Sequence, residues 1–460
     1  MDIQKEILEN EWYGQGLNAV PLIFESATVS TFSMKNTLGY GYHKFYCSYK
    51  EKFGYGNYWK EDLERLSKIL LKKLEKPEYM QWLIDQYFKE FNEAAKIHQE
   101  VVNLSDKSDE TLIELAQKTN LCIREGVGIA HIIEPFSLIA EKIVKDKLES
   151  ELKDKSKLNE LFPLLTAPAE KPFILEYDEL LNKLRKTTEP NKRDDLVKEI
   201  QEKFFWIKNG YAGRKEFTCK DIIAESNELQ DLKNFQSDKK KLIEELNLSP
   251  ELRKLIGLTE KFAYWQDVRK KNTLVAIDYF CKVSEELIER IPLTAEEYYF
   301  LLPEELDKEH LTEEFRVELE KRSKNFVLVN VEEKVYSTTK KLVLEKKEKE
   351  VKTVNGTPAS PGDAIGRVKI CTNFTEMNKV EQGDVLVVSM TRPEYVPAMR
   401  KAVAIVTDEG GLTCHAAVIA RELGKPCIIG TRIATKVFKD NDLVEVRANH
   451  SLIKIIERKK

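Results

Sequence analysis

The sequence predicts a multidomain protein in which a mostly α N-terminal and central region is followed by a C-terminal α/β domain. Three observations predict it. Apolar residues recur every three or four positions between residues 60 and 325, which is the periodicity of an amphipathic helix. A charged run, followed by a cluster of glycine and proline, then marks a linker near residues 331–355. Beyond it, short apolar runs of strand length alternate with two helical patterns.

Residues 1–60 are expected to form an irregular, aromatic-rich segment. Residues 38–59 read LGYGYHKFYCSYKEKFGYGNYW, and glycine at this density opposes a long helix, so we expect loops and short strands. Aromatic rings can stack on an organic molecule, which makes this stretch, with Trp12, Tyr13 and His131, a candidate binding surface. The alternative is that these rings pack in a core, with His131 as a buried core histidine.

Residues 60–330 are expected to form a mostly helical region. Ser108 carries a capping signal for one helix, and residues 249–290 contain almost no helix-breaking residue. Basic residues on that long stretch could face an anionic group, although a charged helix face is usually only solvated. They are Lys261, Arg269, Lys270 and Lys271.

The C-terminal domain, residues 356–460, is expected to contain six strands and two short helices. The predicted strands are residues 366–371, 384–389, 403–407, 426–430, 443–448 and 452–457, and the predicted helices are residues 393–402 and 415–424. In the last turn of this domain, Asn449 can adopt the positive φ that a tight hairpin needs.

Composition excludes several classes of protein. The 74 basic and 78 acidic residues nearly balance, so we expect no nucleic-acid partner and no membrane surface. No apolar stretch approaches the roughly 18 residues of a membrane span. The seven cysteines form no CxxC pair and the N-terminus lacks an apolar signal core, which predicts a reduced, cytoplasmic protein. Histidine and cysteine do not cluster at ligand spacing, so no metal site is expected.

One short stretch concentrates the residues that could carry chemistry. Residues 410–426 read GGLTCHAAVIARELGKP, after the apolar run VAIVT. Thr413 or Cys414 occupies the cap position of a helix that begins near His415, and Gly424 ends it. Because this short helix is almost entirely apolar, we expect it to be covered, with its N-terminus as the open point.

A histidine at a helix start is well placed for phosphoryl chemistry. The positive end of the helix would keep the imidazole of His415 neutral and nucleophilic, and would stabilise an attached phosphoryl group. Gly410, Gly411 and Cys414 are candidate phosphate-binding residues, while Thr413 could orient the ring. The residues alone leave open a simpler interpretation, in which His415 is a helix cap or an ordinary surface residue. The candidate catalytic residues are His415, Thr413 and Arg421, the last as a fixed cation.

The stretch GGLTCHAAVIAR resembles the phosphohistidine signature of the phosphoenolpyruvate-utilising enzymes, which include phosphoenolpyruvate synthase, pyruvate phosphate dikinase and rifampicin phosphotransferase. The flanks GTPASPGDAIGRV and ARELGKPCIIGT resemble the same swivelling domain, so the resemblance covers roughly residues 354–447. It implies that His415 becomes a phosphohistidine. The domain would then swing on the linker 331–355 and deliver the phosphoryl group at a second site.

The resemblance also implies partners, because neither an ATP-grasp module nor a phosphoenolpyruvate barrel is visible in the sequence. We therefore expect a phosphotransferase component that works with a separate ATP-grasp or phosphoenolpyruvate-binding subunit. That partner would supply Mg²⁺ and the nucleotide or phosphoenolpyruvate donor. Residues 60–330 more loosely resemble the region before the histidine domain in rifampicin phosphotransferase, which implies binding of a small-molecule acceptor. The alternative is a non-catalytic regulatory or binding protein that retains the swivelling domain.

Overall fold

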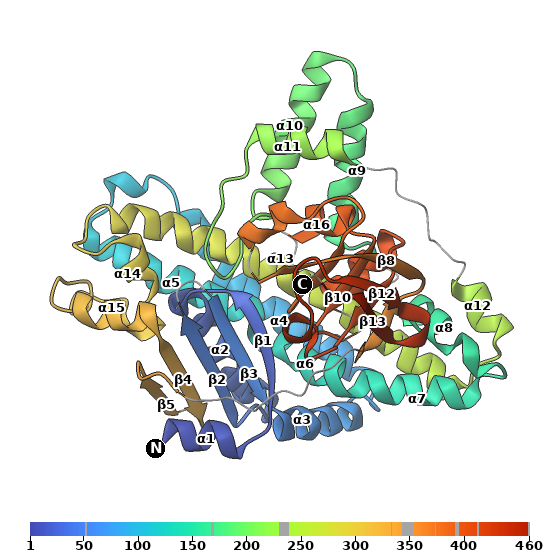
Figure 1. The fold of residues 1–460 in the computed structure, drawn as a ribbon. Coiled ribbons are helices and arrows are strands. Elements are labelled where there is room, and N and C mark those ends of the chain that lie inside the picture. The colour runs from blue at the N-terminus through green and yellow to red at the C-terminus, as the bar shows by residue number, and fades with distance from the viewer. Residues whose placement is uncertain are drawn as a thin grey trace. The chain divides into compact units, whose positions relative to one another are not determined.

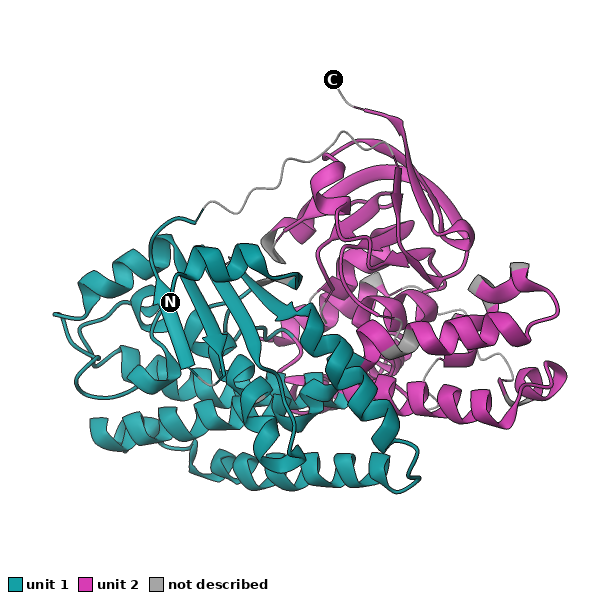
Figure 2. Ribbon diagram, turned by 90° about the horizontal axis from the view of Figure 1, so that it is seen from below, with its two compact units in different colours: residues 1–135, 208–215, 268–346 teal, residues 136–207, 216–267, 347–460 magenta. Residues whose placement is uncertain are grey.

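The structure is a computed structural model, and it forms two compact units (Figure 2). Unit 1 comprises residues 1–135, 208–215 and 268–346, and unit 2 comprises residues 136–207, 216–267 and 347–460. Each unit is discontinuous in sequence, whereas the domains predicted from the sequence are consecutive segments. The structure describes residues 1–50, 53–166, 170–229, 239–332, 334–342, 353–372, 374–391, 395–411 and 414–458.

Unit 1 is rich in helices, as the periodicity predicts (Figure 1). Ser108 caps α5 as expected, since its side chain accepts the N–H of Thr111 at 3.3 Å. The long run without helix breakers forms α13, of which the part from Val268 belongs to unit 1. The α-helices are α1 (Ile3–Glu9), α2 (Pro21–Leu38), α3 (Lys60–Lys73), α4 (Tyr79–Ala95), α5 (Asp109–Val127), α6 (Ile133–Pro135), α13 (Pro250–Ile288), α14 (Ala295–Tyr299) and α15 (Arg316–Lys324).

Unit 1 also contains an antiparallel sheet, of which the sequence predicted only short strands in residues 38–59. Its order is β1-β3-β2-β4-β5. Strands β2 and β3 are the short strands expected in residues 38–59, whereas β1 and the pairing of these strands into one sheet were not predicted, so the described part of residues 1–60 is more regular than expected. Glycine is compatible with these strands because aromatic rings lie over them: a Cβ on Gly56 would lie 2.9 Å from Phe24 Cζ. The strands are β1 (Trp12–Asn18), β2 (Lys44–Lys50), β3 (Phe53–Trp59), β4 (Phe326–Val331) and β5 (Lys334–Thr338).

The candidate aromatic surface is largely core. Tyr42, Phe45, Tyr49 and Tyr58 are all buried, so these rings pack inside the unit as the alternative interpretation held. His131 is also buried, and its Nε2 lies 2.5 Å from the Tyr58 hydroxyl. A histidine with this environment is a satisfied core residue.

Part of the predicted linker 331–355 forms strands. Residues 334–338 form strand β5, which pairs with β4 in the sheet of unit 1. Residues 353–355 form strand β6. Residues 343–352, the charged part of the predicted linker, lie outside the described residues.

Unit 2 combines helices with a second sheet. Its α-helices are α7 (Glu141–Glu151), α8 (Leu158–Thr166), α9 (Phe173–Lys186), α10 (Pro190–Phe204), α11 (Cys219–Glu228), α12 (Lys239–Glu245), the part of α13 up to Asp267, α16 (Val396–Lys401), α17 (His415–Glu422) and α18 (Ala434–Val437). Among the described residues of both units, no helix is long and apolar enough to cross a membrane.

All six strands predicted in the C-terminal domain are present in an eight-stranded sheet with the order β6-β13-β12-β8-β9-β10-β11-β7. The two strands that were missed are short, and β7 contains Pro358, which an edge strand tolerates. The strands are β6 (Thr353–Asn355), β7 (Thr357–Ser360), β8 (Asp363–Cys371), β9 (Val385–Val388), β10 (Ala404–Thr407), β11 (Cys427–Ile429), β12 (Leu443–Arg447) and β13 (Leu452–Glu457).

The middle of this sheet positions the candidate site. Strands β8, β9, β10 and β11 run parallel to one another, and their apolar side chains form the core of the domain. Segments that follow neighbouring parallel strands meet at one edge of the sheet. The turn after β10 leads into α17 there. In the last hairpin, Ser451 takes the positive φ of 60° that was predicted for Asn449, whose side chain instead accepts the N–H of Gly362.

Candidate functional site

The site begins where α17 begins. Cys414 is the N-cap residue, with φ −69° and ψ 160°, and its side chain makes no capping hydrogen bond. Its own N–H donates to the Gly411 carbonyl at 2.9 Å. The first N–H groups of an α-helix have no partner within the helix, so a cap without a side-chain acceptor suits an incoming anion.

The end of α17 follows the prediction. Gly424 has φ +60°, and its N–H donates to the Arg421 carbonyl at 3.0 Å while the N–H of Lys425 donates to the Ala420 carbonyl at 2.9 Å. This pair of bonds is a Schellman motif, which glycine stabilises because it adopts a positive φ without strain.

Thr391 holds the imidazole of His415. The Thr391 Oγ1 and His415 Nδ1 atoms lie 2.9 Å apart, and both residues are buried. The hydrogen bond fixes the ring plane and occupies Nδ1. No sequence motif pointed to Thr391, although its position is informative, because Thr391 follows β9 and His415 follows the parallel neighbour β10.

The ring is not open to solvent, which corrects one prediction. His415 is only 5% exposed and its Nε2 atom is buried, whereas the N-terminus of α17 was expected to be the open point. The helix packs against β7 and β11, and the ring lies against Thr391 instead of projecting outward. In this conformation the imidazole is therefore shielded from solvent.

Two buried acids brace the turn that precedes α17. The Asp408 carboxylate accepts the Thr431 hydroxyl at 2.8 Å and the N–H of Thr435 at 3.2 Å, at the start of α18. The Glu409 carboxylate accepts the Ser389 hydroxyl at 2.5 Å. These bonds tie the turn to the sheet and to α18, so the acids stabilise the backbone that carries the histidine.

Gly410 is required by its surroundings. Its φ is +110°, and a Cβ at this position would lie 2.7 Å from Cys414 Sγ. A side chain there would be strained and would collide with the N-cap residue. Gly411 accepts the N–H of Cys414. Thr413, a candidate catalytic residue, lies outside the described residues.

Comparison with known proteins agrees with this geometry. Residues 380–451 match the family model of the "PEP-utilising enzyme, mobile domain". That region is similar to the mobile domain of the phosphoenolpyruvate-utilising enzymes, and we refer to it as the mobile domain. The resemblance noted in GGLTCHAAVIAR is thereby confirmed for the C-terminal part of the chain, and the histidine of α17 lies within the matched residues.

Relatives of this mobile domain are much longer proteins. A probable phosphoenolpyruvate synthase of Archaeoglobus fulgidus is 53% identical over 100 residues, which are 22% of this chain and 13% of that protein. One of Methanothermobacter thermautotrophicus is 53% identical over 100 residues, 22% of this chain and 15% of that protein. The phosphoenolpyruvate synthase of Escherichia coli is 54% identical over 81 residues, 18% of this chain and 10% of that protein. The chain therefore matches only a small part of each relative.

Arg421 lies at the far end of the mobile domain's helix from His415. Its Nε donates to the Ala359 carbonyl of β7 at 2.9 Å. Arg421 lies six positions after His415, which corresponds to about 9 Å along the helix axis. The contact that the structure shows for Arg421 thus anchors α17 to β7, and its contact with a phosphoryl group stays a prediction.

The basic residues of α13 are a second candidate for phosphate contact. Arg269 Nη2 lies 2.9 Å from Glu134 Oε1, and the side chains of this pair are largely buried. Its guanidinium is therefore committed to an ion pair within unit 1. Among the described residues there is no group of three or more His, Cys, Asp or Glu side chains that could hold a metal ion, so we assign no step to a metal held by this part of the chain.

Proposed function

We propose that this chain is the phosphohistidine component of a phosphotransferase system. His415 accepts a phosphoryl group from a separate subunit that uses ATP or phosphoenolpyruvate, and passes it to a small acceptor. The observation that carries the proposal is the buried His415, held at Nδ1 by Thr391 at the start of α17, inside a matched mobile domain.

The two transfers follow from this geometry. Because Nδ1 bonds to Thr391, we assign the nucleophile to Nε2. In the first step the Nε2–P bond forms as the donor's P–O bond breaks. In the second step the Nε2–P bond breaks, a P–O bond forms to the acceptor hydroxyl, and the hydroxyl proton passes to solvent. The N–H groups at the start of α17 stabilise the phosphoryl oxygens between the two steps.

The burial of His415 supports a moving carrier. The imidazole reaches neither donor nor acceptor in the conformation described, so the mobile domain has to leave this position for each transfer. The donor subunit is an ATP-grasp or phosphoenolpyruvate-binding protein, and Mg²⁺ accompanies its nucleotide or phosphoenolpyruvate. The acceptor binds to the helical region, residues 60–330. We assign the reaction to the cytoplasm, since the chain's cysteine pattern is that of a reduced protein.

The test is direct labelling of the histidine. The chain is incubated with ³²P-labelled ATP or phosphoenolpyruvate, with and without a candidate ATP-grasp partner. A label that is acid-labile and base-stable is expected on the wild type and is lost in His415→Ala. His450→Ala is the matched control, because His450 is an exposed histidine of the same domain, and it should label normally.

Two outcomes would contradict the proposal. If His415→Ala carries as much label as the wild type, His415 is not the carrier. If no donor and no partner labels the wild type, the alternative gains support, in which the mobile domain serves a regulatory or binding role without turnover.

A further inference from the structure

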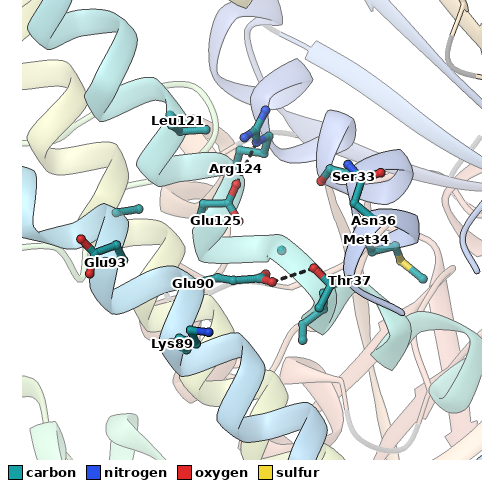
Figure 3. A pocket seen from close by; sticks show the side chains of 13 residues that line it. Ser33, Met34, Asn36, Thr37, Lys89, Glu90, Glu93, Leu121, Arg124 and Glu125 are labelled. Carbon is teal, nitrogen blue, oxygen red and sulfur yellow. Dashed lines mark hydrogen bonds and ion pairs between the residues drawn. The ribbon is translucent and has the colours of Figure 1, made fainter. Parts of the chain in front are cut away.

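Unit 1 contains a pocket away from the phosphohistidine. Helices α2, α4 and α5 and the 3₁₀ turn Gly128–Ile132 surround it (Figure 3), and its volume is about 640 Å³. Pockets of this size hold small organic molecules. Part of its lining is apolar and comes from Met34, Ala94, Leu121 and Ile129.

The charges that line the pocket are not fully compensated. Glu125 pairs with Arg124 at 2.9 Å, and Glu93 pairs with Lys96 at 2.5 Å. Glu90 is the third carboxylate of the lining, and among the described residues it forms no ion pair. Burial raises the pKa of Glu90; the Thr37 hydrogen bond and the charges of Lys89 and Arg124 lower it, the charge of Glu125 raises it, and the net direction is upward. A ligand cation beside Glu90 would favour the charged carboxylate and so oppose this net upward shift.

The Glu90 carboxylate is held in a defined position. Thr37 on α2 donates its hydroxyl to Glu90 Oε1 at 2.7 Å, and Figure 3 shows the two side chains reaching toward each other from α2 and α4. The hydroxyl occupies one carboxylate oxygen and leaves the charge in place. Lys89 also lines the pocket, but its side chain is exposed and forms no ion pair with Glu90.

We infer that this pocket binds a small organic molecule in which a protonated amine pairs with Glu90 and an apolar body covers Met34, Leu121 and Ile129. The lining holds three carboxylates against the two cations Lys89 and Arg124, so its net negative charge disfavours an anionic ligand, while the apolar lining favours a ligand larger than a metal ion. That this molecule is also the phosphoryl acceptor rests on the function proposed above. The inference that the molecule binds in this pocket does not depend on that function.

The test compares three probes of similar shape by calorimetric titration of the full chain: tyramine, neutral 4-ethylphenol and anionic 4-hydroxyphenylacetate. Tyramine should bind at least about tenfold more tightly than either of the others, since a charge-assisted hydrogen bond contributes this much. Glu90→Gln should reduce tyramine binding to the level of 4-ethylphenol, and its amide oxygen still accepts the Thr37 hydroxyl. Glu114→Gln, an exposed position of α5 outside the lining, is the matched control and should bind normally.

A second variant tests the location independently of Glu90. Leu121 is 40% exposed at the pocket, so Leu121→Trp is tolerated on the surface and should obstruct the pocket and weaken tyramine binding. If Glu90→Gln lowers the melting temperature, the Leu121→Trp variant decides whether tyramine binds in this pocket. The inference is overturned if tyramine does not bind, if the neutral or anionic probe binds as well, or if both variants bind tyramine like the wild type.

The result is separable from the proposed function. Amine binding without any label on His415 would overturn the phosphotransferase proposal and leave the pocket assignment intact. A label on His415 without amine binding would overturn the pocket assignment and leave the phosphotransferase proposal intact.

Discussion

The Thr391 Oγ1 and His415 Nδ1 atoms lie 2.9 Å apart although the residues are 24 positions apart in the chain. The contact exists because β9 and β10 are parallel neighbours, so the segments that follow them meet at one edge of the sheet. The orientation of the imidazole therefore depends on the pairing of β9 with β10 in the sheet. Nδ1 is thereby held by Thr391, which leaves Nε2 as the nitrogen that the proposed phosphoryl transfer requires.

Replacement of Thr391 should therefore slow phosphorylation without unfolding the domain. Thr391→Val keeps the volume and loses the hydrogen bond, whose net value of about 1 kcal/mol corresponds to roughly fivefold in rate. Thr391→Ser should restore most of the rate. The rate of ³²P transfer to His415 measures the effect, and ¹⁵N NMR of the ring reports the tautomer. An unchanged rate and an unchanged tautomer in Thr391→Val would contradict the positioning role.

The sequence was most informative where an interaction is local. The N-cap of α17, the Gly424 stop and the six strands of the C-terminal domain depend on neighbouring residues, and each was predicted correctly. Thr391 was missed because its partner is reached only through strand pairing. The pairing of the short strands expected in residues 38–59 was missed for the same reason, since β2 pairs with β4, whose residues lie almost 300 positions later.

Burial was predicted less well than position. The apolar face of α17 indicated that the helix is covered, but it did not say whether its first turn is covered too. His415 is 5% exposed, so the first turn of the helix is covered at this residue. Likewise, the aromatic segment 38–59 was consistent with a binding surface or a core, and only the packing of Tyr42 and Tyr58 decides for the core.

Gly410→Ala should destabilise the mobile domain more than Gly383→Ala. Both glycines have a positive φ, +110° and +98°, but a Cβ on Gly383 meets nothing within 4 Å. Backbone strain of about 1–3 kcal/mol is common to both variants, and the collision with Cys414 adds about 1–3 kcal/mol only at Gly410. Urea unfolding measures the difference.

The Cys414 collision can be isolated in a double variant. Adding Cys414→Ala to Gly410→Ala removes the Sγ atom that the new Cβ would meet, so part of the loss should be recovered. Equal losses for Gly410→Ala and Gly383→Ala, or no recovery in the double variant, would show that the close approach has no energetic role.

The buried His131 should make unit 1 sensitive to acid. Burial, together with the nearby Arg269, lowers the pKa of His131 well below 6.5. Below pH about 6.5 the unfolded chain therefore binds a proton that the folded chain does not, and stability falls by roughly 1.4 kcal/mol per pH unit until the folded pKa is reached. His131→Gln should lose this slope in urea titrations between pH 7 and 5. His98→Gln, at an exposed position, should keep it, and an identical slope in His131→Gln would contradict the assignment.

The ion pair of Asp178 and Arg400 within unit 2 offers a test of how His415 becomes accessible. Asp178 belongs to α9, outside the mobile domain, and Arg400 belongs to α16, inside it. Their side chains are 3% and 15% exposed, and Lys425 Nζ donates to the Arg400 carbonyl at 2.7 Å. Removal of one partner from a buried pair leaves the other charge uncompensated, which costs about 3 kcal/mol or more.

Asp178→Asn should therefore weaken the contact between α9 and α16 and increase the exposure of His415. The expected results are a lower urea midpoint and faster modification of His415 by diethyl pyrocarbonate, followed by mass spectrometry of the peptide. Glu189→Gln breaks an exposed pair with Lys192 and should change neither, because such pairs contribute less than about 1 kcal/mol. If Asp178→Asn lowers the urea midpoint while His415 reacts no faster, the pair stabilises unit 2 without governing the release of its histidine. If both change together, the contact that holds the mobile domain is also the one that keeps its nucleophile covered.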